Sequence, residues 1–193
     1  MLIIEIDSSG SEVSVTWLHA HKRCRIFTAG RKAHREAANA TMVDSDNVLL
    51  LRPASPTSGF SLENKERSRT GSNEVLKELI VATIYYFGAP LSAGFVEFFE
   101  QTLQPAATDT GASILAYFVT EDSENTFPAL PVREGENVFV WLARFKDQTA
   151  YELHVAALAR SSRWRDEISE ELVRRLKQAP EVLKLSPTAR SLL

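Results

Sequence analysis

The sequence is poor in several features that mark particular classes of protein. It contains one cysteine, Cys24, so no disulfide can form within the chain. Its longest apolar-leaning run, Leu79 to Phe87, is too short to cross a bilayer, and the first residues lack a secretion signal. The formal charge of -3 gives no electrostatic reason to expect nucleic acid or an anionic membrane as a partner. These absences predict a cytoplasmic protein with no membrane span.

Motifs of nucleotide binding and hydrolysis are absent as well. There is no glycine-rich phosphate loop, no Walker motif and no Ser-His-Asp order. What is present is an ordinary globular composition, with 44 % apolar and 24 % charged residues in a chain of 193. This length allows one domain or two small ones. We therefore predict no cofactor, and the residues by themselves indicate no reaction.

Turn-forming residues divide the chain into parts. Prolines, glycines and serines gather between Pro53 and Gly71, with charges of alternating sign among them. This composition is typical of a linker. We predict a partial domain at residues 1–53, a linker at 54–74 and a complete domain at 75–193.

The segment from residue 75 onward alternates between strand and helix patterns. Plausible N-caps at Ser92, Asp147 and Ser161 or Ser162 begin the expected helices. Strands are expected at Leu76–Phe87, Ile114–Thr120, Val138–Phe145 and Val182–Leu185. With one helix after the first strand and two before the last, this order predicts an α+β fold, the ferredoxin-like βαββαβ domain with a four-stranded antiparallel sheet.

Two details of these elements predict how they pack. The first helix is expected to fray between Pro105 and Gly111. Both faces of the strand Val138–Phe145 carry apolar side chains, so both are expected to be buried. Because helices cover only one face of a ferredoxin-like sheet, we expect a partner to cover the other.

An internal repeat explains the first part of the chain. The stretch Asn47–Pro53 matches Glu181–Pro187, and each follows a charged segment that favours a helix. We therefore expect a helix at Gly30–Ser45 and a closing strand at Asn47–Leu51, the end of a first copy of the domain. Before them there is room only for short strands, which are expected at Leu2–Ile6, Val13–His19 and Cys24–Thr28.

Several stretches of the sequence resemble the NIPSNAP family of the dimeric α/β-barrel superfamily. They are TEDSENTFPALPVREGENVFVWLARF (Thr120 to Phe145), AALARSSRW ending at Trp164, and EVLKLSPTARSLL (Glu181 to Leu193). The stretch Lys32 to Pro53 is similar to the end of the first domain in tandem members of the family, whereas Met1 to Ala29 departs from the family pattern.

The resemblance implies a ferredoxin-like domain that closes a barrel by pairing its sheet face with a second such domain. Because the first copy is partial, the expected partner is a second chain, which gives a homodimer. The family has no agreed enzymatic activity. We predict a dimerising binding or assembly module that could hold a small apolar or aromatic ligand. The alternative, by analogy with the superfamily, is a cofactor-independent monooxygenase-like enzyme.

Candidate ligand-pocket residues come from three strands and one helix. Tyr85, Tyr117, Trp141 and Arg144 could form an aromatic pocket with one cation, suited to a flat or acidic small ligand. The other interpretation places them in the sheet core and a dimer interface. His154 could serve as a base or a haem ligand, but a single histidine with no carboxylate three or four residues after it is more often a packed or partly exposed side chain.

A long loop and a small histidine cluster complete the candidates. The loop Glu121–Glu136 exceeds an ordinary hairpin connection, and we expect Asn125, Phe127 and Arg133 in a lid or a dimer arm, with plain loop variability as the alternative. His19, His21 and Cys24 could begin a metal site. Zinc requires three or four ligands at fixed spacing, so we predict no metal.

Overall fold

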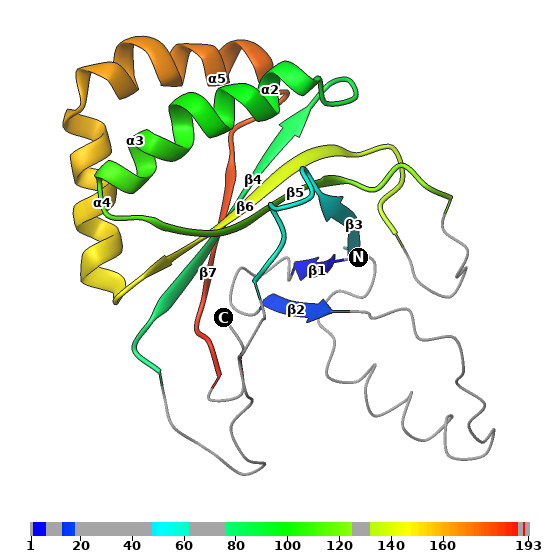
Figure 1. The fold of residues 1–193 in the computed structure, drawn as a ribbon, viewed down its shortest axis with the longest axis horizontal. Helices are drawn as coiled ribbons and strands as arrows, with labels where there is room; N and C mark the ends of the chain where they lie inside the picture. Colours follow the sequence, from blue (N-terminus) through cyan, green and yellow to red (C-terminus); the bar gives the residue numbers. More distant parts are fainter. Residues whose placement is uncertain are drawn as a thin grey trace. The chain divides into compact units, whose positions relative to one another are not determined.

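A computed structural model describes residues 2–6, 13–17, 48–61, 76–124, 132–188 and 191 (Figure 1). The chain divides into two compact units. Unit 1 consists of Met1–Arg52 and Thr120–Gly135, and unit 2 consists of Pro53–Val119 and Glu136–Leu193.

The described residues of unit 1 form three antiparallel strands. The strand β1 (Leu2–Ile6) pairs with β2 (Val13–Trp17) on one side and with β3 (Val48–Pro53) on the other. The strands predicted near Leu2, Val13 and Asn47 are therefore confirmed. The predicted strand Cys24–Thr28 and helix Gly30–Ser45 lie outside the described residues.

Unit 2 contains a four-stranded antiparallel sheet in the order β5-β6-β4-β7. Its strands are β4 (Leu79–Phe87), β5 (Ser113–Thr120), β6 (Asn137–Phe145) and β7 (Glu181–Leu185). The helices gather on one face of this sheet (Figure 1). The element order and the strand order confirm the predicted α+β, ferredoxin-like fold.

Two helical regions contain π-helical turns. The first runs through α2 (Ala93–Phe98), η1 (Phe99–Leu103) and α3 (Gln104–Asp109). The second consists of α4 (Gln148–Arg160), η2 (Trp164–Ile168) and α5 (Ser169–Arg175). The predicted cap at Asp147 is confirmed, because its carboxylate accepts a 2.8 Å hydrogen bond from the Ala150 N–H.

The first helix does not fray at Pro105, so that expectation is wrong. A proline inside a regular α-helix clashes with the carbonyl four residues before it. Here the π-helical turn η1 lies directly before α3, which allows the helix to continue through Pro105. The helix ends instead at Gly111, whose φ of 105° is the left-handed conformation that glycine adopts at helix ends. The Ala112 N–H then bonds the Ala107 carbonyl at 3.0 Å.

Both faces of the sheet in unit 2 are buried. On the helix side, Phe95, Phe99, Ile168 and Leu172 pack on the sheet residues of one large cluster. The side chains on the opposite face are 1 % exposed or less: Ile80, Ile84, Phe118, Val140 and Leu142. The burial predicted for both faces of β6 is confirmed. The prediction that a partner chain covers the face opposite the helices stays a prediction.

Part of the predicted linker packs on unit 2. The Ala54 N–H donates to the Tyr117 carbonyl at 3.3 Å, and the Tyr117 N–H donates to the Ser58 carbonyl at 2.9 Å. Ser58 is buried, and the Phe60 ring lies 5.5 Å from that of Phe118. Residues 54–60 therefore attach to β5 through both backbone and side chains.

Candidate functional site

The three aromatic residues predicted for a ligand pocket lie in the core beneath the helices. Tyr85, Trp141 and Tyr117 all belong to the cluster that Phe95 and Phe99 cover. The Tyr85 ring stacks on Phe139 with a centroid distance of 6.4 Å, and Phe99 lies 5.9 Å from Trp141. The structure thus brings these rings together as packed core contacts.

Tyr85 is only 2 % exposed, and this burial raises the pKa of its phenol. The nearby indole N–H of Trp141 partly offsets the rise in the pKa of Tyr85. This N–H is buried, and it has no hydrogen-bond partner of ordinary geometry among the described residues. Tyr85 therefore stays protonated at neutral pH.

Tyr117 lies nearer the surface and has a charged partner. Its hydroxyl donates a 2.6 Å hydrogen bond to Glu100 Oε1 on η1. Burial is the main cause that raises the pKa of this phenol, and the Glu100 carboxylate adds to it by accepting the proton's hydrogen bond. The pair links β5 to the helix above it.

Arg144 does not join the aromatic residues. It lies three positions after Trp141 on the same strand, so its side chain projects from the opposite face. Its Nε is buried and has no hydrogen-bond partner among the described residues. The four strand residues therefore do not form one pocket.

His154 is packed between helices. It is 4 % exposed on α4, and its Nδ1 lies 2.8 Å from Thr110 Oγ1 at the end of the first helix. Its ring is 5.0 Å from that of Phe145. Burial lowers the pKa of His154, and a hydrogen bond to Thr110 opposes this shift. These contacts favour the interpretation of His154 as a packed side chain.

The long loop is anchored to β3 at both described ends. The Glu121 N–H donates to the Leu50 carbonyl at 2.8 Å, and the Arg133 N–H donates to the Val48 carbonyl at 2.9 Å. Arg52 and Asp122 also form an exposed ion pair at 3.4 Å. Asn125 and Phe127 lie outside the described residues, as do His19, His21 and Cys24. A lid or dimer arm therefore remains a prediction.

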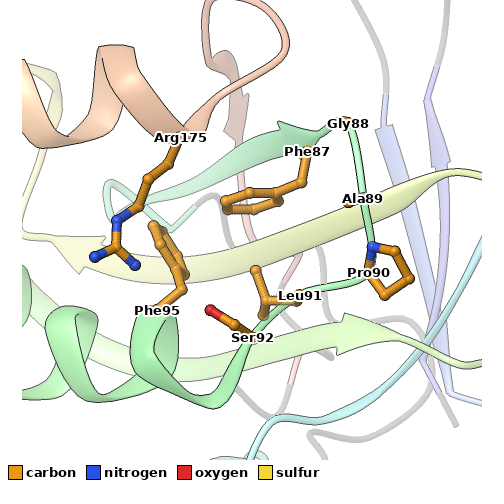
Figure 2. Close-up of a pocket in the computed structure, with 8 residues that line it drawn as sticks. All are labelled: Phe87, Gly88, Ala89, Pro90, Leu91, Ser92, Phe95 and Arg175. Carbon is orange, nitrogen blue, oxygen red and sulfur yellow. The ribbon is translucent and has the colours of Figure 1, made fainter.

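A pocket of about 370 Å³ lies where β4 passes into the first helix (Figure 2). Phe87 and Phe95 form its apolar side, and the connecting residues 88–92 and Arg175 complete the lining. Phe95 is buried beneath the pocket, whereas residues 88–90 are exposed. All of these residues belong to unit 2.

Backbone pairing fixes the two sides of this pocket against each other. Phe87 forms an antiparallel bridge with Leu176, and the Lys177 N–H donates to the Tyr86 carbonyl at 2.8 Å. The residue directly before this bridge is Arg175. The end of α5 is thereby held beside the end of β4, which places the guanidinium at the pocket.

Arg175 itself is held by charge and by aromatic rings. Its Nε donates a 2.5 Å hydrogen bond to Glu171 Oε1, one turn earlier on α5. The guanidinium carbon lies 5.5 Å from the ring centre of Phe98 and 6.0 Å from that of Phe95. The arrangement offers an apolar surface with one oriented cation.

Local sequence patterns do not indicate this pocket. Arg175 reads as one of several basic residues at a helix end, and Phe87 as the last residue of a strand. A partial signal exists in the turn residues Gly88 and Pro90, which separate Phe87 from Leu91 and the helix that follows. The described residues contain no group of three metal-ligating side chains. None of the helices in the same residues is long and apolar enough to span a membrane.

Crystal structures of three bacterial proteins are similar to this chain. An uncharacterised NIPSNAP-like domain protein from Burkholderia xenovorans is 19 % identical, with a TM-score of 0.48 over 60 % of this chain and 90 % of its own. An uncharacterised NIPSNAP domain protein from the same organism is 19 % identical, with a TM-score of 0.46 over 57 % and 95 % of the two chains. A NIPSNAP family protein from Agrobacterium tumefaciens strain C58 is 15 % identical, with a TM-score of 0.45 over 57 % and 93 %.

The chain matches no protein-family model and no curated protein at a significant level. The fold class stated above rests on the strand order of unit 2 itself.

Proposed function

We propose that the chain is a ligand-binding protein and that unit 2 holds a small, largely apolar ligand in the pocket beside Arg175. The observation that supports this proposal is the pocket itself, about 370 Å³ in volume and lined by Phe87, Leu91 and Phe95. Small-molecule sites are commonly concave, largely apolar and roughly 300–1,000 Å³ in volume, with few polar groups that orient the ligand. Arg175 and Ser92 are the polar side chains of this lining.

The ligand would gain most of its binding free energy from apolar contact. Phe87 and Phe95 present their rings at a centroid distance of 4.7 Å, and Leu91 is half-buried beside them. A flat or branched apolar group could remove the exposed part of Leu91 from water and gain van der Waals contact with the two buried rings.

The assembly part of the expected function has a weaker basis. A homodimer through the sheet face is expected from the resemblance, whereas the pocket lies within the described residues of one chain. The monooxygenase alternative depends on Tyr85, Tyr117 and Trp141 around a cavity, and these rings make core contacts instead. Ligand binding is therefore the function that the described geometry favours.

A titration of the full chain with a neutral apolar probe, 2-naphthalenemethanol, tests the proposal. We expect backbone amide shifts that saturate at Gly88, Ala89, Leu91 and Ser92. The variant Leu91→Ala should weaken binding roughly fivefold, because it removes part of a half-buried apolar contact. Leu153→Ala is the matched control, since Leu153 is 63 % exposed on α4 and does not line the pocket.

Two outcomes would contradict the proposal. One is the absence of saturable shifts at the four pocket residues in a chain that is folded by circular dichroism. The other is an equal loss of affinity in Leu91→Ala and Leu153→Ala, which would show that the probe binds apolar surface without selecting the pocket.

A further inference from the structure

We infer that the ligand of this pocket is an amphiphilic monocarboxylate, an apolar body that carries one carboxylate group, and this inference rests on the proposed function. The apolar body would lie on Phe87, Leu91 and Phe95, and the carboxylate would bind the guanidinium of Arg175. Three properties of Arg175 favour a carboxylate: its charge, its orientation and its remaining hydrogen-bond donors.

The charge at the pocket is positive. Arg175 is the charged residue of the lining, and its neighbour Glu171 is shared with a second arginine. Glu171 Oε1 lies 2.5 Å from Arg175 Nη2, and its Oε2 lies 2.5 Å from Arg174 Nη2. One carboxylate therefore stands against two guanidinium groups, and this cluster keeps one positive charge that an anionic ligand could balance.

The orientation of Arg175 is fixed before a ligand arrives. Its main chain adjoins the bridge between Phe87 and Leu176, and its guanidinium lies over the rings of Phe98 and Phe95. A side chain held in this way loses little rotamer freedom when it binds an anion. Figure 2 shows the guanidinium end of Arg175 reaching from α5 toward the side of the pocket where Phe95 lies.

Hydrogen-bond donors remain for a carboxylate. A guanidinium carries five N–H groups. In Arg175, Nε donates to Glu171 Oε1, and Nη2 forms an ion pair with the same oxygen. The Nη1 donors have no partner among the described residues. The Ser92 hydroxyl also lines the pocket and does not cap its helix, so it is a further donor. A planar fork of donors fits a carboxylate better than a neutral hydroxyl.

The test compares two probes that share one apolar body. The full chain is titrated with 2-naphthoate and with 2-naphthalenemethanol, and amide shifts at Gly88, Ala89 and Leu91 are followed. We expect the carboxylate to bind about tenfold tighter or more, because its hydrogen bonds to Arg175 are charge-assisted. Arg175→Gln should remove this preference, so that the two probes bind the variant with affinities within about twofold of each other.

Matched variants make the result specific. Arg163→Gln is the control, because Arg163 forms an exposed pair with Glu167 at 3.7 Å and does not line the pocket. It should keep the preference for 2-naphthoate. Arg175→Lys retains the charge without the planar fork, so we expect a smaller preference for 2-naphthoate over the neutral probe. This variant replaces Arg175→Gln in the test if Arg175→Gln does not fold.

The outcomes separate this inference from the proposed function. Equal affinity of the two probes, with shifts at the pocket residues, overturns the carboxylate inference and leaves ligand binding in place. An equal effect of Arg163→Gln and Arg175→Gln also overturns it, since general electrostatics would then explain the preference. If neither probe shifts the pocket residues, the proposed function itself fails.

Discussion

Nδ1 of His154 lies 2.8 Å from Oγ1 of Thr110, which ties α4 to the end of the first helix. The Thr110 hydroxyl also lies 3.0 Å and 2.9 Å from the carbonyl oxygens of Ala106 and Ala107. If its single proton goes to a carbonyl, the imidazole must donate through Nδ1. This contact joins two helices that cover the same sheet, and two predictions follow from it.

Protonation of His154 is expected to destabilise the protein. Burial lowers the pKa of His154 in the folded state below its ordinary value of about 6.5. The unfolded chain therefore binds the proton first as the pH falls. The contribution of neutral His154 to the free energy of unfolding is fully present above about pH 6.5. It decreases as the pH falls from there toward the folded-state pKa, by at most about 1.4 kcal/mol per pH unit.

Urea unfolding at pH 7.5 and at pH 5.5 measures this dependence. His154→Gln should reduce the difference in unfolding free energy between the two pH values. The comparison with the original chain removes the contribution of the other three histidines. An unchanged difference in the variant would show that His154 does not cause the pH dependence.

Loss of the Thr110 hydroxyl should destabilise unit 2. Thr110→Val removes the partner of a buried imidazole nitrogen, at a cost of about 1–3 kcal/mol in unfolding free energy. Thr108→Val is the control, because the Thr108 hydroxyl bonds the Gln104 carbonyl at an exposed position. Equal effects of the two substitutions in urea unfolding would contradict the prediction.

Gly111 should tolerate no side chain, in contrast to Gly94. Gly111→Ala forces an L-residue into a φ of 105°, which should cost about 1–2 kcal/mol of unfolding free energy. Gly94→Ala lies in α2, and the nearest atom to an added Cβ is 3.9 Å away, so we expect it to be neutral or stabilising. Thermal unfolding of both variants measures the change in unfolding free energy that each substitution causes. A loss of stability in both variants, or in neither, would contradict the prediction.

Limited proteolysis should cut the predicted linker only after residue 61. Residues 54–60 are hydrogen-bonded to β5, and Ser58 is buried, so a protease cannot bind this stretch in extended form. The sequence predicts a stable fragment from about residue 75, and the structure adds that residues 54–60 stay bound to it. Mass spectrometry of the fragments under native conditions measures this. Early cleavage within 54–60 would refute it.

Light scattering tests the homodimer. The resemblance to dimeric α/β-barrel proteins predicts that a second chain pairs with the sheet face opposite the helices, so we expect the mass of a dimer at micromolar concentration. The mass of a monomer would contradict the homodimer.

Much of unit 2 could be predicted from local sequence patterns. The strand at Val138–Phe145 and the cap at Asp147 follow from side-chain alternation and from the hydrogen-bonding capacity of a carboxylate, and both are confirmed. Pro105 was misleading because its effect depends on the π-helical turn before it. A π-helical turn has no simple residue signature, so the continuation of the helix was not predictable.

The site could be predicted only in part. Residues 141 and 144 are an odd number of positions apart on one strand, so alternation alone places Trp141 and Arg144 on opposite faces. Which face the helices cover is decided by tertiary packing, and no local pattern states that Tyr85 lies under Phe95. The pocket depends on the pairing of Phe87 with Leu176, a contact between segments distant in the chain. Local periodicity carries no information about such a contact.

The bridge between Phe87 and Leu176 also bears on the order of folding. It joins the first strand of unit 2 to a segment that follows all of its helices, and contacts across such a separation close a long loop. The pocket is therefore complete only when nearly the whole of unit 2 has assembled. A ligand at this place would bind the native state alone and, by mass action, act as a pharmacological chaperone for the unit.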